Sequence, residues 1–271
     1  MAIYVTGDLH GSAQIHRFST KNFPLGTTLT KDDYIIVVGD FGLVWCDSAE
    51  ELWWRDWLEN RPWTTLFIDG NHENHAALAE FPERRWNGGR IHELSPSVLH
   101  LMRGQVFELD GQRIFTMGGA TSIDRKARVE GVSWWKEELP TQAELEEAHV
   151  SLDACDWKVD YVLTHCCASS LLRRVYPDGN IWQGPDELTD WLDILEHHLS
   201  FKLWYFGHHH KDMALEPAHR LIYHDIVRLG ETHPVEHHTL RAETSWDSEA
   251  SVPHWLQSQR NNTQQTDKST V

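Results

Sequence analysis

The chain has 271 residues and a formal net charge of −17 at pH 7. This acidic balance argues against nonspecific binding of long DNA or RNA, which depends on lysine and arginine displacing counterions, and against docking on an anionic membrane. A small anionic substrate stays open, because surface charge is screened over about 10 Å and a bound metal ion can dominate a pocket. The length fits one large domain or two small ones.

The cysteine pattern does not resemble a disulfide framework. The sequence has four cysteines and no CxxC pair, and two of the cysteines, Cys166 and Cys167, are adjacent. The N-terminus lacks the basic stretch and apolar core of a secretion signal, and no apolar run approaches the roughly 20 residues of a membrane span. We therefore expect a reduced, cytoplasmic protein in which the two adjacent thiols are buried and inert.

Short apolar strands alternate with helices in the N-terminal part of the chain. Strands are predicted over 2–6, 34–38 and 64–68, and helices over 12–23, 48–60 and 74–81. Ser48 and Glu51 have the spacing of a capping box, and Pro62 follows the predicted end of that helix. The uninterrupted apolar run over 34–38 is typical of a strand buried on both faces of a parallel sheet.

Antiparallel strands are expected from Pro82 to Pro140, where Asp110-Gly111 gives a hairpin signal. This region contains predicted strands over 98–101, 105–109 and 113–117, followed by a polar loop over 122–138. The remaining elements are predicted helices over 141–152 and 186–199 and strands over 160–164, 202–206 and 221–229. From Glu243 the chain is polar, so we expect one domain over 1–242 and a disordered tail over 243–271.

Five predicted strands are each followed at once by a side chain that can ligate a metal ion. These side chains are Asp8 and His10, Asp40, Asn71 and His72, His165, and His208 and His210. Strands that alternate with helices favour a largely parallel sheet, whose carboxyl ends form the ligand-binding edge. Alternation in extended chain places Asp8 and His10 on one side and turns His209 away from its neighbours. Mixed oxygen and nitrogen donors suit a divalent metal, so we expect a metal site at this edge.

The order of these motifs, GD-x-HG, GD, GNHE, a strand-end histidine and GH-x-H, resembles the calcineurin-like metallophosphoesterase superfamily. The match extends from Asp8 to His210. The resemblance implies an α/β fold with central β-sheets flanked by helices, and two divalent ions at the carboxyl ends of the strands. It implies a first ion held by Asp8, His10 and His210, a second held by Asn71, His165 and His208, and Asp40 as the ligand that bridges both.

The resemblance also implies hydrolysis of a small phosphate ester. Asp40 would hold the metal pair whose shared water attacks phosphorus, His72 would protonate the leaving oxygen, and Asn71 would also touch the substrate. Mn²⁺ is the expected metal, with Fe, Zn²⁺ and Ni²⁺ as alternatives, because Asp, Asn and His suit all of them. Two other functions stay open: a phosphodiesterase or nuclease for short or cyclic nucleotides, and a catalytically weak metal-binding interaction module.

The second motif departs from GD-x-x-DR, the form found in the phosphoprotein phosphatase branch. Leu43 and Val44 replace the aspartate that orients the catalytic histidine and the arginine that anchors phosphate, which disfavours protein phosphatase activity. The block over 118–135 is similar to a group of bacterial and phage metallophosphoesterases. Its basic residues lead us to expect that Arg125 or Arg128 supplies the phosphate contact, the alternative being a solvated surface loop.

Overall fold

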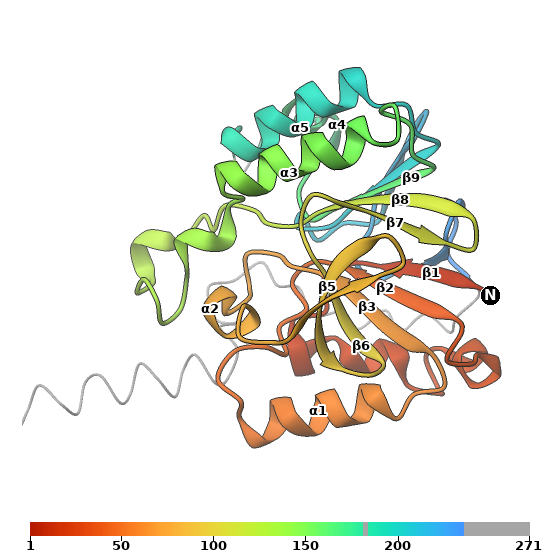
Figure 1. Ribbon diagram of the computed structural model, residues 1–271. Helices are drawn as coiled ribbons and strands as arrows, with labels where there is room; N and C mark the ends of the chain where they lie inside the picture. The colour runs from red at the N-terminus through yellow and green to blue at the C-terminus, as the bar shows by residue number, and fades with distance from the viewer. Residues whose placement is uncertain (181–183, 236–271) are drawn as a thin grey trace, which may run out of the picture. The chain divides into compact units, whose positions relative to one another are not determined.

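Two β-sheets lie face to face in the computed structural model, which describes residues 1–180 and 184–235 (Figure 1). The first sheet contains, in spatial order, β13 (Ile226–Arg228), β1 (Ile3–Thr6), β2 (Tyr34–Val38), β3 (Thr64–Ile68), β6 (Val98–Leu101), β5 (Gly89–Ser95) and β4 (Glu83–Trp86). The second contains β11 (Met213–Leu215), β12 (His219–Leu221), β10 (Leu203–Phe206), β9 (Tyr161–Thr164), β8 (Gln112–Met117) and β7 (Gln105–Leu109). The predicted tail over 243–271 and the predicted boundary at residue 242 lie outside the described residues.

Each sheet has a parallel centre and antiparallel edges. Strands β1, β2, β3 and β6 run parallel in the first sheet, as do β12, β10, β9 and β8 in the second. Strands β13, β5 and β11 pair antiparallel with their neighbours, as do the hairpin partners β7 and β8 around the predicted Asp110-Gly111 turn. Parallel neighbours end at the same edge, so several loops of each sheet meet on one side.

Apolar side chains from both sheets form the central layer between them. Strand alternation directs Val5, Ile36 and Leu66 of the first sheet toward Leu163 and Tyr205 of the second, and all five are fully buried. The opposite faces of the same strands are also apolar, because helices cover them. This double burial explains why the central strands read as continuous apolar runs.

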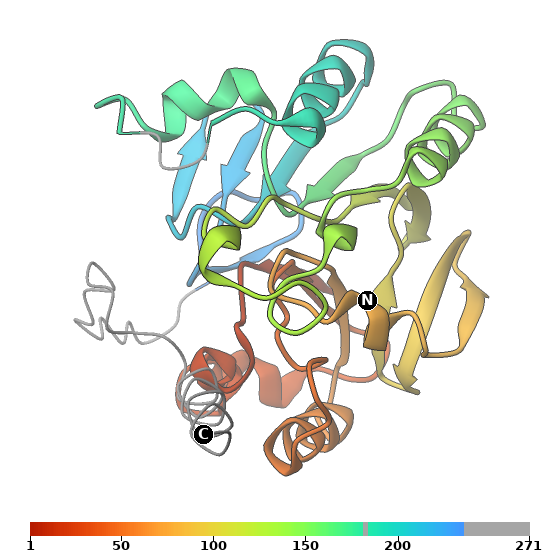
Figure 2. The same cartoon turned by 90° about the vertical axis from the view of Figure 1, so that its left-hand side faces the viewer.

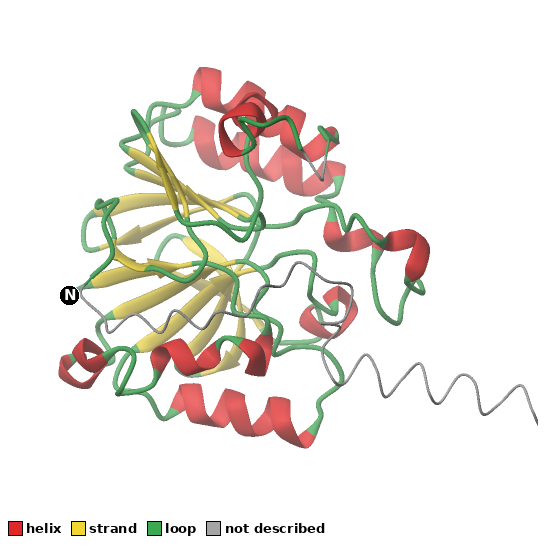
Figure 3. Ribbon diagram, turned by 180° about the vertical axis from the view of Figure 1, so that it is seen from behind, coloured by secondary structure: helices red, strands yellow, loops and turns green. Residues whose placement is uncertain are grey.

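Helices cover the outer faces of both sheets (Figures 1 and 3). The α-helices are α1 (Ala49–Glu59), α2 (His75–Leu78), α3 (Gln142–Asp153), α4 (Leu172–Val175) and α5 (Glu187–His198). Leu58 of α1 packs in the cluster on the first sheet, and Leu152 of α3 and Leu192 of α5 pack in the cluster on the second. The arrangement confirms the predicted α/β class with central sheets flanked by helices.

The predicted helix over 12–23 is wrong. The chain there forms short 3-10 turns, η1 (Gly11–Ala13), η2 (Ile15–Phe18) and η3 (Pro24–Thr28). Extended backbone at Ser19 ends the second turn, and the side chain of Asn22 donates to the carbonyl of His16 at 2.8 Å. Local side-chain bonds of this kind compete with a continuous helix, although Ile15 and Phe18 still bury their apolar face as predicted.

The predicted single strand over 221–229 is also wrong, because the chain changes sheets within it. Residues up to Leu221 belong to β12 in the second sheet, and Ile226–Arg228 forms β13 at the edge of the first. Between them, the carboxylate of Asp212 accepts hydrogen bonds from the backbone amides of residues 223–225 at 2.8–3.2 Å. These bonds replace a strand ladder and turn the chain toward its new partner, β1.

Candidate metal centre

The predicted metal-capable residues follow five strands that come from both sheets. Asp8, Asp40 and Asn71 follow β1, β2 and β3 of the first sheet, whereas His165 and His208 follow β9 and β10 of the second. The expectation of one largely parallel sheet was therefore incomplete, because two sheets share the site. Figure 2 views the molecule from the side on which these strands end, with the yellow-green segment around residues 120–138 in front.

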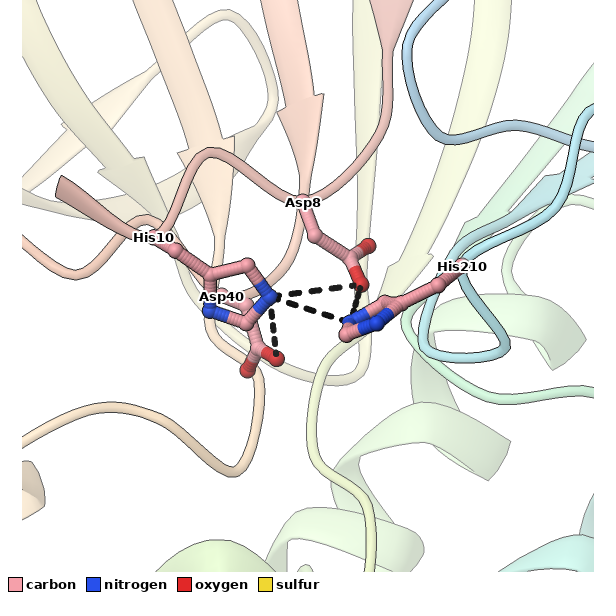
Figure 4. Close-up of side chains that lie close together, drawn as sticks. All are labelled: Asp8, His10, Asp40 and His210. Atoms are coloured by element: carbon pink, nitrogen blue, oxygen red, sulfur yellow. Dashed lines mark hydrogen bonds and ion pairs between the residues drawn. The ribbon is translucent and has the colours of Figure 1, made fainter. Parts of the chain in front are cut away.

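One group of ligand atoms consists of two carboxylates and two imidazoles, from Asp8, His10, Asp40 and His210 (Figure 4). Nε2 of His10 lies 3.9 Å from Oδ2 of Asp8 and 3.8 Å from Oδ2 of Asp40. Nε2 of His210 lies 3.1 Å from the same Asp8 oxygen and 3.0 Å from Nε2 of His10. The four side chains thus point at one common space.

A second group consists of Asp40, His165 and His208, all of them buried. Nε2 of His165 lies 3.2 Å from Oδ1 of Asp40 and 3.3 Å from Oδ1 of Asn71. The rings of His165 and His208 are 5.0 Å apart between centroids. The amide oxygen of Asn71 therefore faces the same imidazole as the carboxylate of Asp40.

Asp40 belongs to both groups, and its two oxygens face different neighbours. Oδ2 faces His10 in the first group, whereas Oδ1 faces His165 in the second. The backbone amide of His72 also donates to Oδ1 at 2.8 Å, which fixes the carboxylate orientation. A carboxylate with one oxygen directed at each of two donor groups has the geometry needed to bridge two ions.

The donor set fits divalent cations. The buried Oδ2 of Asp8 receives no well-aligned hydrogen bond from the described residues, although the imidazole nitrogen of His210 lies 3.1 Å away. In each group all ligand atoms lie within 4.8 Å of one another. Atoms bound to one ion at about 2.0–2.2 Å lie roughly 3–4 Å apart, so small side-chain shifts would complete either site. Carboxylate, amide and imidazole donors suit the transition metals predicted from the sequence.

The charges of the site support this fit. Burial raises the pKa of Asp8, but the imidazoles of His210 and His165 outweigh it and hold that pKa below its usual value. Burial likewise raises the pKa of Asp40, but the charge of the His165 imidazole outweighs it and holds that pKa well below its usual value. Both carboxylates are therefore ionised and buried, a state that carries a large free-energy cost unless cations compensate it.

The surroundings shift the pKa values of His165 and His72 in opposite directions. Burial lowers the pKa of His165, but the Asp40 carboxylate reverses the effect and raises that pKa to about 9. Burial lowers the pKa of His72 to about 3, opposed by Asp40 and reinforced by His10 and Arg128. His72 is therefore a neutral imidazole in this structure at neutral pH.

The ring of His165 is held in one orientation by the backbone. Its Nδ1 lies 2.9 Å from the carbonyl oxygen of Val38, a contact in which Nδ1 donates and which directs Nε2 into the site. Gly39 makes this approach feasible, because a Cβ there would lie 2.0 Å from Nδ1 of His165. The glycine before Asp40 is thus required by the packing of a candidate ligand.

Four candidate ligands adopt left-handed backbone conformations: His10, Asp40, His208 and His210, with φ of 48°, 48°, 67° and 49°. Such conformations are unfavourable for residues with a Cβ and concentrate at functional sites. They correct the expectation that Asp8 and His10 leave an extended strand side by side. The imidazole of His10 reaches the site because the chain turns there, immediately before η1.

A family model of calcineurin-like phosphoesterases matches residues 1–212. The chain belongs to the calcineurin-like phosphoesterase family. The matched region includes every candidate ligand, from Asp8 to His210, and membership confirms the resemblance seen in the sequence. It indicates a metal-dependent phosphoesterase, and the residues gathered at the strand ends are candidates for the divalent-metal site typical of this family.

Among solved structures, a phosphopantetheinyl hydrolase from Mycobacterium tuberculosis is similar to this calcineurin-like phosphoesterase chain. The two share 18% sequence identity over 82% of this chain and 90% of that chain, with a TM-score of 0.42. No curated protein matches the chain in sequence. None of the helices in the described part of the chain has the length and apolarity needed to cross a bilayer.

Ser122 contacts the candidate site in a way that the sequence did not reveal. The Asn71 side-chain amide donates to Oγ of Ser122 at 3.2 Å, which turns its oxygen toward His165. The backbone amide of Ser122 in turn donates to the buried carboxylate of Glu138 at 2.9 Å. A serine in a loop carries no pattern that predicts such a contact across 51 positions.

Two arginines, the half-buried Arg17 and the buried Arg103, also support the site and were missed. Arg17 donates through its guanidinium to the backbone carbonyls of Gly7 at 3.2 Å and Asp8 at 2.8 Å. Arg103 binds the carboxylate of Asp69 with two bonds, of 2.9 and 2.5 Å, in the loop that leads to Asn71. Charge-assisted bonds of this kind fix loop backbones firmly. Nothing in the sequence around either arginine predicts these contacts, because their partners meet them only in the folded chain.

The structure separates the two arginines proposed for phosphate binding. A pocket of about 210 Å³ opens beside the candidate metal groups, and Arg128 lines it together with His72 and Asn71. Nη2 of Arg128 lies 3.4 Å from Nε2 of His72. Arg125 is absent from the lining, because its guanidinium pairs with Glu138 and covers the ring of Trp134.

Proposed function

We propose that this protein hydrolyses phosphate esters with the help of two divalent metal ions, for which Mn²⁺ is the first choice to test. The observation that carries the proposal is the position of Asp40, whose two oxygens face two separate donor groups. Divalent ions at these groups supply water activation and neutralise charge on the phosphate oxygens. The expected ligands are those named from the sequence: Asp8, His10, Asp40, Asn71, His165, His208 and His210.

Arg128 positions the phosphate in this proposal. Its guanidinium lies in the pocket with only 10% of its side chain exposed, and it faces His72 across 3.4 Å. A planar guanidinium binds two phosphate oxygens at once, which orients the group as well as holding it. Arg128 thereby takes the place of the anchoring arginine that Val44 replaces in the second motif. Arg125 has a structural task, since it compensates the buried carboxylate of Glu138.

His72 delivers the proton to the leaving oxygen. In the described structure it is neutral, with a pKa lowered to about 3 by burial. A phosphate group bound between His72 and Arg128 adds negative charge next to the imidazole, which favours its protonated form and raises its pKa. Proton transfer to the leaving group then returns His72 to the neutral state that its surroundings prefer.

The test is turnover of p-nitrophenyl phosphate and bis-p-nitrophenyl phosphate by the full chain, reconstituted in turn with Mn²⁺, Fe²⁺, Zn²⁺ and Ni²⁺. We expect metal-dependent hydrolysis of at least one of the two esters and about two bound ions per chain. Asp40→Asn should abolish turnover and lower metal content. Asp47→Asn is the matched control, because Asp47 has similar backbone geometry (φ 52°) and lies exposed outside the site.

The outcomes separate the alternatives. Turnover of the diester alone would favour the phosphodiesterase or short-nucleotide nuclease function over phosphomonoester hydrolysis. Metal binding by the parent protein without turnover of either ester or of nucleotides would favour a metal-binding interaction module and overturn the proposal. Equal loss of metal in Asp40→Asn and Asp47→Asn would show that the ions bind elsewhere.

A further inference from the structure

One wall of the pocket comes from a single segment of the chain. Ile123, Asp124 and Arg128 line it, and the candidate ligands Asp40, His208 and His210 also belong to the lining. Because Arg128 and the candidate ligands receive the phosphate in the proposed function, the other two side chains of this segment, Ile123 and Asp124, are left to contact the rest of the substrate. These two side chains therefore select the alcohol or other group to which the phosphate is attached.

This segment exposes apolar side chains. Ile123, Val129 and Val132 are 56%, 62% and 49% exposed, and all three lie within ten residues of one another. Single exposed apolar residues are ordinary, but an exposed apolar side chain that lines a pocket can contact a bound ligand. Ile123 belongs to both the group and the pocket lining. Covering it with an apolar substrate group would gain about 25 cal/mol for each Å² removed from water.

The charges of the wall disfavour a second phosphate. Among the described residues that line the pocket, Arg128 alone carries a permanent positive charge. Nε of Arg128 is paired with Oδ1 of Asp124 at 2.8 Å, and the Asp124 side chain remains 48% exposed. A second anionic group on the substrate would meet this carboxylate, and the described lining offers it no lysine or arginine besides Arg128, which holds the first phosphate in the proposed function. A neutral group would meet no such repulsion.

We propose that the substrate carries one phosphate on an apolar, uncharged alcohol, with Ile123 as the apolar contact and Asp124 as the residue that rejects a second phosphate. This inference rests on the proposed phosphoesterase function and specifies the substrate class of that same site. It commits to the chemistry of the group next to the phosphate and applies equally to monoesters and diesters.

The test compares three substrates of similar size with primary-alcohol leaving groups: butyl phosphate, glycerol phosphate and butanediol bisphosphate. The corresponding symmetric diesters of butanol and glycerol are run in parallel. We expect kcat/KM to be highest for the butyl ester and lowest for the bisphosphate. Ile123→Ser should reduce the preference for butyl over glyceryl esters about tenfold, the scale of losing a few methylene contacts. Asp124→Asn should reduce discrimination against the bisphosphate by a similar factor.

Ile194→Ser is the matched control, because Ile194 is equally exposed, at 58%, and lies on α5 outside the pocket lining. Affinity for butylphosphonate and glyceryl phosphonate, measured by calorimetry on the full chain, adds a readout that needs no turnover. Hydrolysis with equal selectivity in the parent, Ile123→Ser and Ile194→Ser would overturn this inference and leave the phosphoesterase function standing. Binding of butylphosphonate that depends on Ile123, without hydrolysis of any ester, would support this inference and overturn the phosphoesterase function.

Discussion

Arg125 and Arg128 show how two similar residues, three positions apart, acquire different tasks. Arg128 lines the pocket and faces His72, whereas Arg125 binds the buried carboxylate of Glu138. The sequence places both in one basic cluster and offers no means to separate them. The separation depends on Glu138, because its buried carboxylate needs a cationic partner and Arg125 provides it.

We predict that Arg128→Ala raises KM for p-nitrophenyl phosphate by about 10- to 100-fold, the equivalent of the 1.5–3 kcal/mol of hydrogen bonds to a charged group. Its melting temperature should change little, because Asp124, its ion-pair partner, is half exposed. Arg125→Ala should do the opposite, lowering the melting temperature while KM changes less. Steady-state kinetics and thermal denaturation of both variants check this, and Arg125→Lys should recover most of the lost stability.

The prediction would be contradicted if both variants changed KM equally, or if Arg128→Ala destabilised the fold while Arg125→Ala did not. Either result would place the phosphate contact elsewhere in the pocket. Asn71 is the next residue to test in that case, because it lines the same pocket and its amide is oriented by Ser122.

At the scale of elements, the turn that follows β10 carries two candidate ligands in strained conformations. His208 and His210 both have left-handed backbones, with φ of 67° and 49°. The residue between them, His209, is buried on the other side of the turn. Its Nδ1 lies 3.2 Å from the hydroxyl of Tyr176, and its Nε2 lies 3.4 Å from Sγ of Cys167. These contacts of His209 stabilise the conformation of the turn that carries His208 and His210.

We predict that Tyr176→Phe weakens metal affinity by about tenfold, because groups that orient ligands are worth about 10–100-fold in affinity. Competition with a chromogenic chelator measures this without reference to catalysis. Cys155→Ser is the control, since the thiol of Cys155 donates to the nearby carbonyl of Leu152 in the cluster on the second sheet, away from the candidate ligands. An unchanged affinity in Tyr176→Phe, or an equal loss in both variants, would show that the turn keeps its shape without this hydroxyl.

The elements themselves differ in how well the sequence predicts them. The strands over 34–38 and 64–68 agree with the structure because a continuous apolar run has few alternatives once both faces are covered. The helix over 12–23 was wrong because Asn22 and Ser19 satisfy backbone groups locally, and no period in the apolar residues reveals such bonds. The exchange of sheets after Leu221 depends on hydrogen bonds to the side chain of Asp212, and the apolar pattern over 221–229 contains no sign of them.

The motifs predict which side chains come together at the candidate site, but they do not predict how each side chain is oriented. Asp40 and His165 follow strands whose ends meet, and this much is implied by strand order and the family resemblance. The division of the two Asp40 oxygens depends on the backbone amide of His72 and on the approach of His165 to Gly39. Both contacts form only when the two sheets pack together, and the sequence pattern does not reveal how the sheets pack.

At the scale of the whole molecule, buried neutral histidines tie stability to pH. Burial lowers the pKa of His75 to about 3 and that of His209 to about 3. In the unfolded chain such groups titrate near about 6.5, so the unfolded state binds more protons below that pH. Their contribution to stability is therefore complete above about pH 6.5 and is lost as the pH falls. His165 acts oppositely, since its pKa is raised to about 9 and its contribution is lost as the pH rises through that value.

We predict that the free energy of unfolding of the metal-free protein falls as the pH is lowered from about 7 to about 4.5. Each neutral buried histidine contributes a slope of up to about 1.4 kcal/mol per pH unit. His75→Gln should make the dependence shallower by about one proton, because glutamine does not titrate. Urea denaturation across this range measures the slope. A dependence that is flat in the parent protein, or unchanged in His75→Gln, would contradict the assignment.

The division of the ligands between two sheets has a consequence for how the protein matures. Nε2 of His10 and Nε2 of His210 are 3.0 Å apart in space and 200 positions apart in sequence. Neither sheet alone presents all the donors of either candidate group. The first half of the chain therefore cannot complete a candidate site before the second half has folded. If the proposed ions bind here, they would bind only after the two sheets have come together, and binding would stabilise the folded chain by linking its two halves.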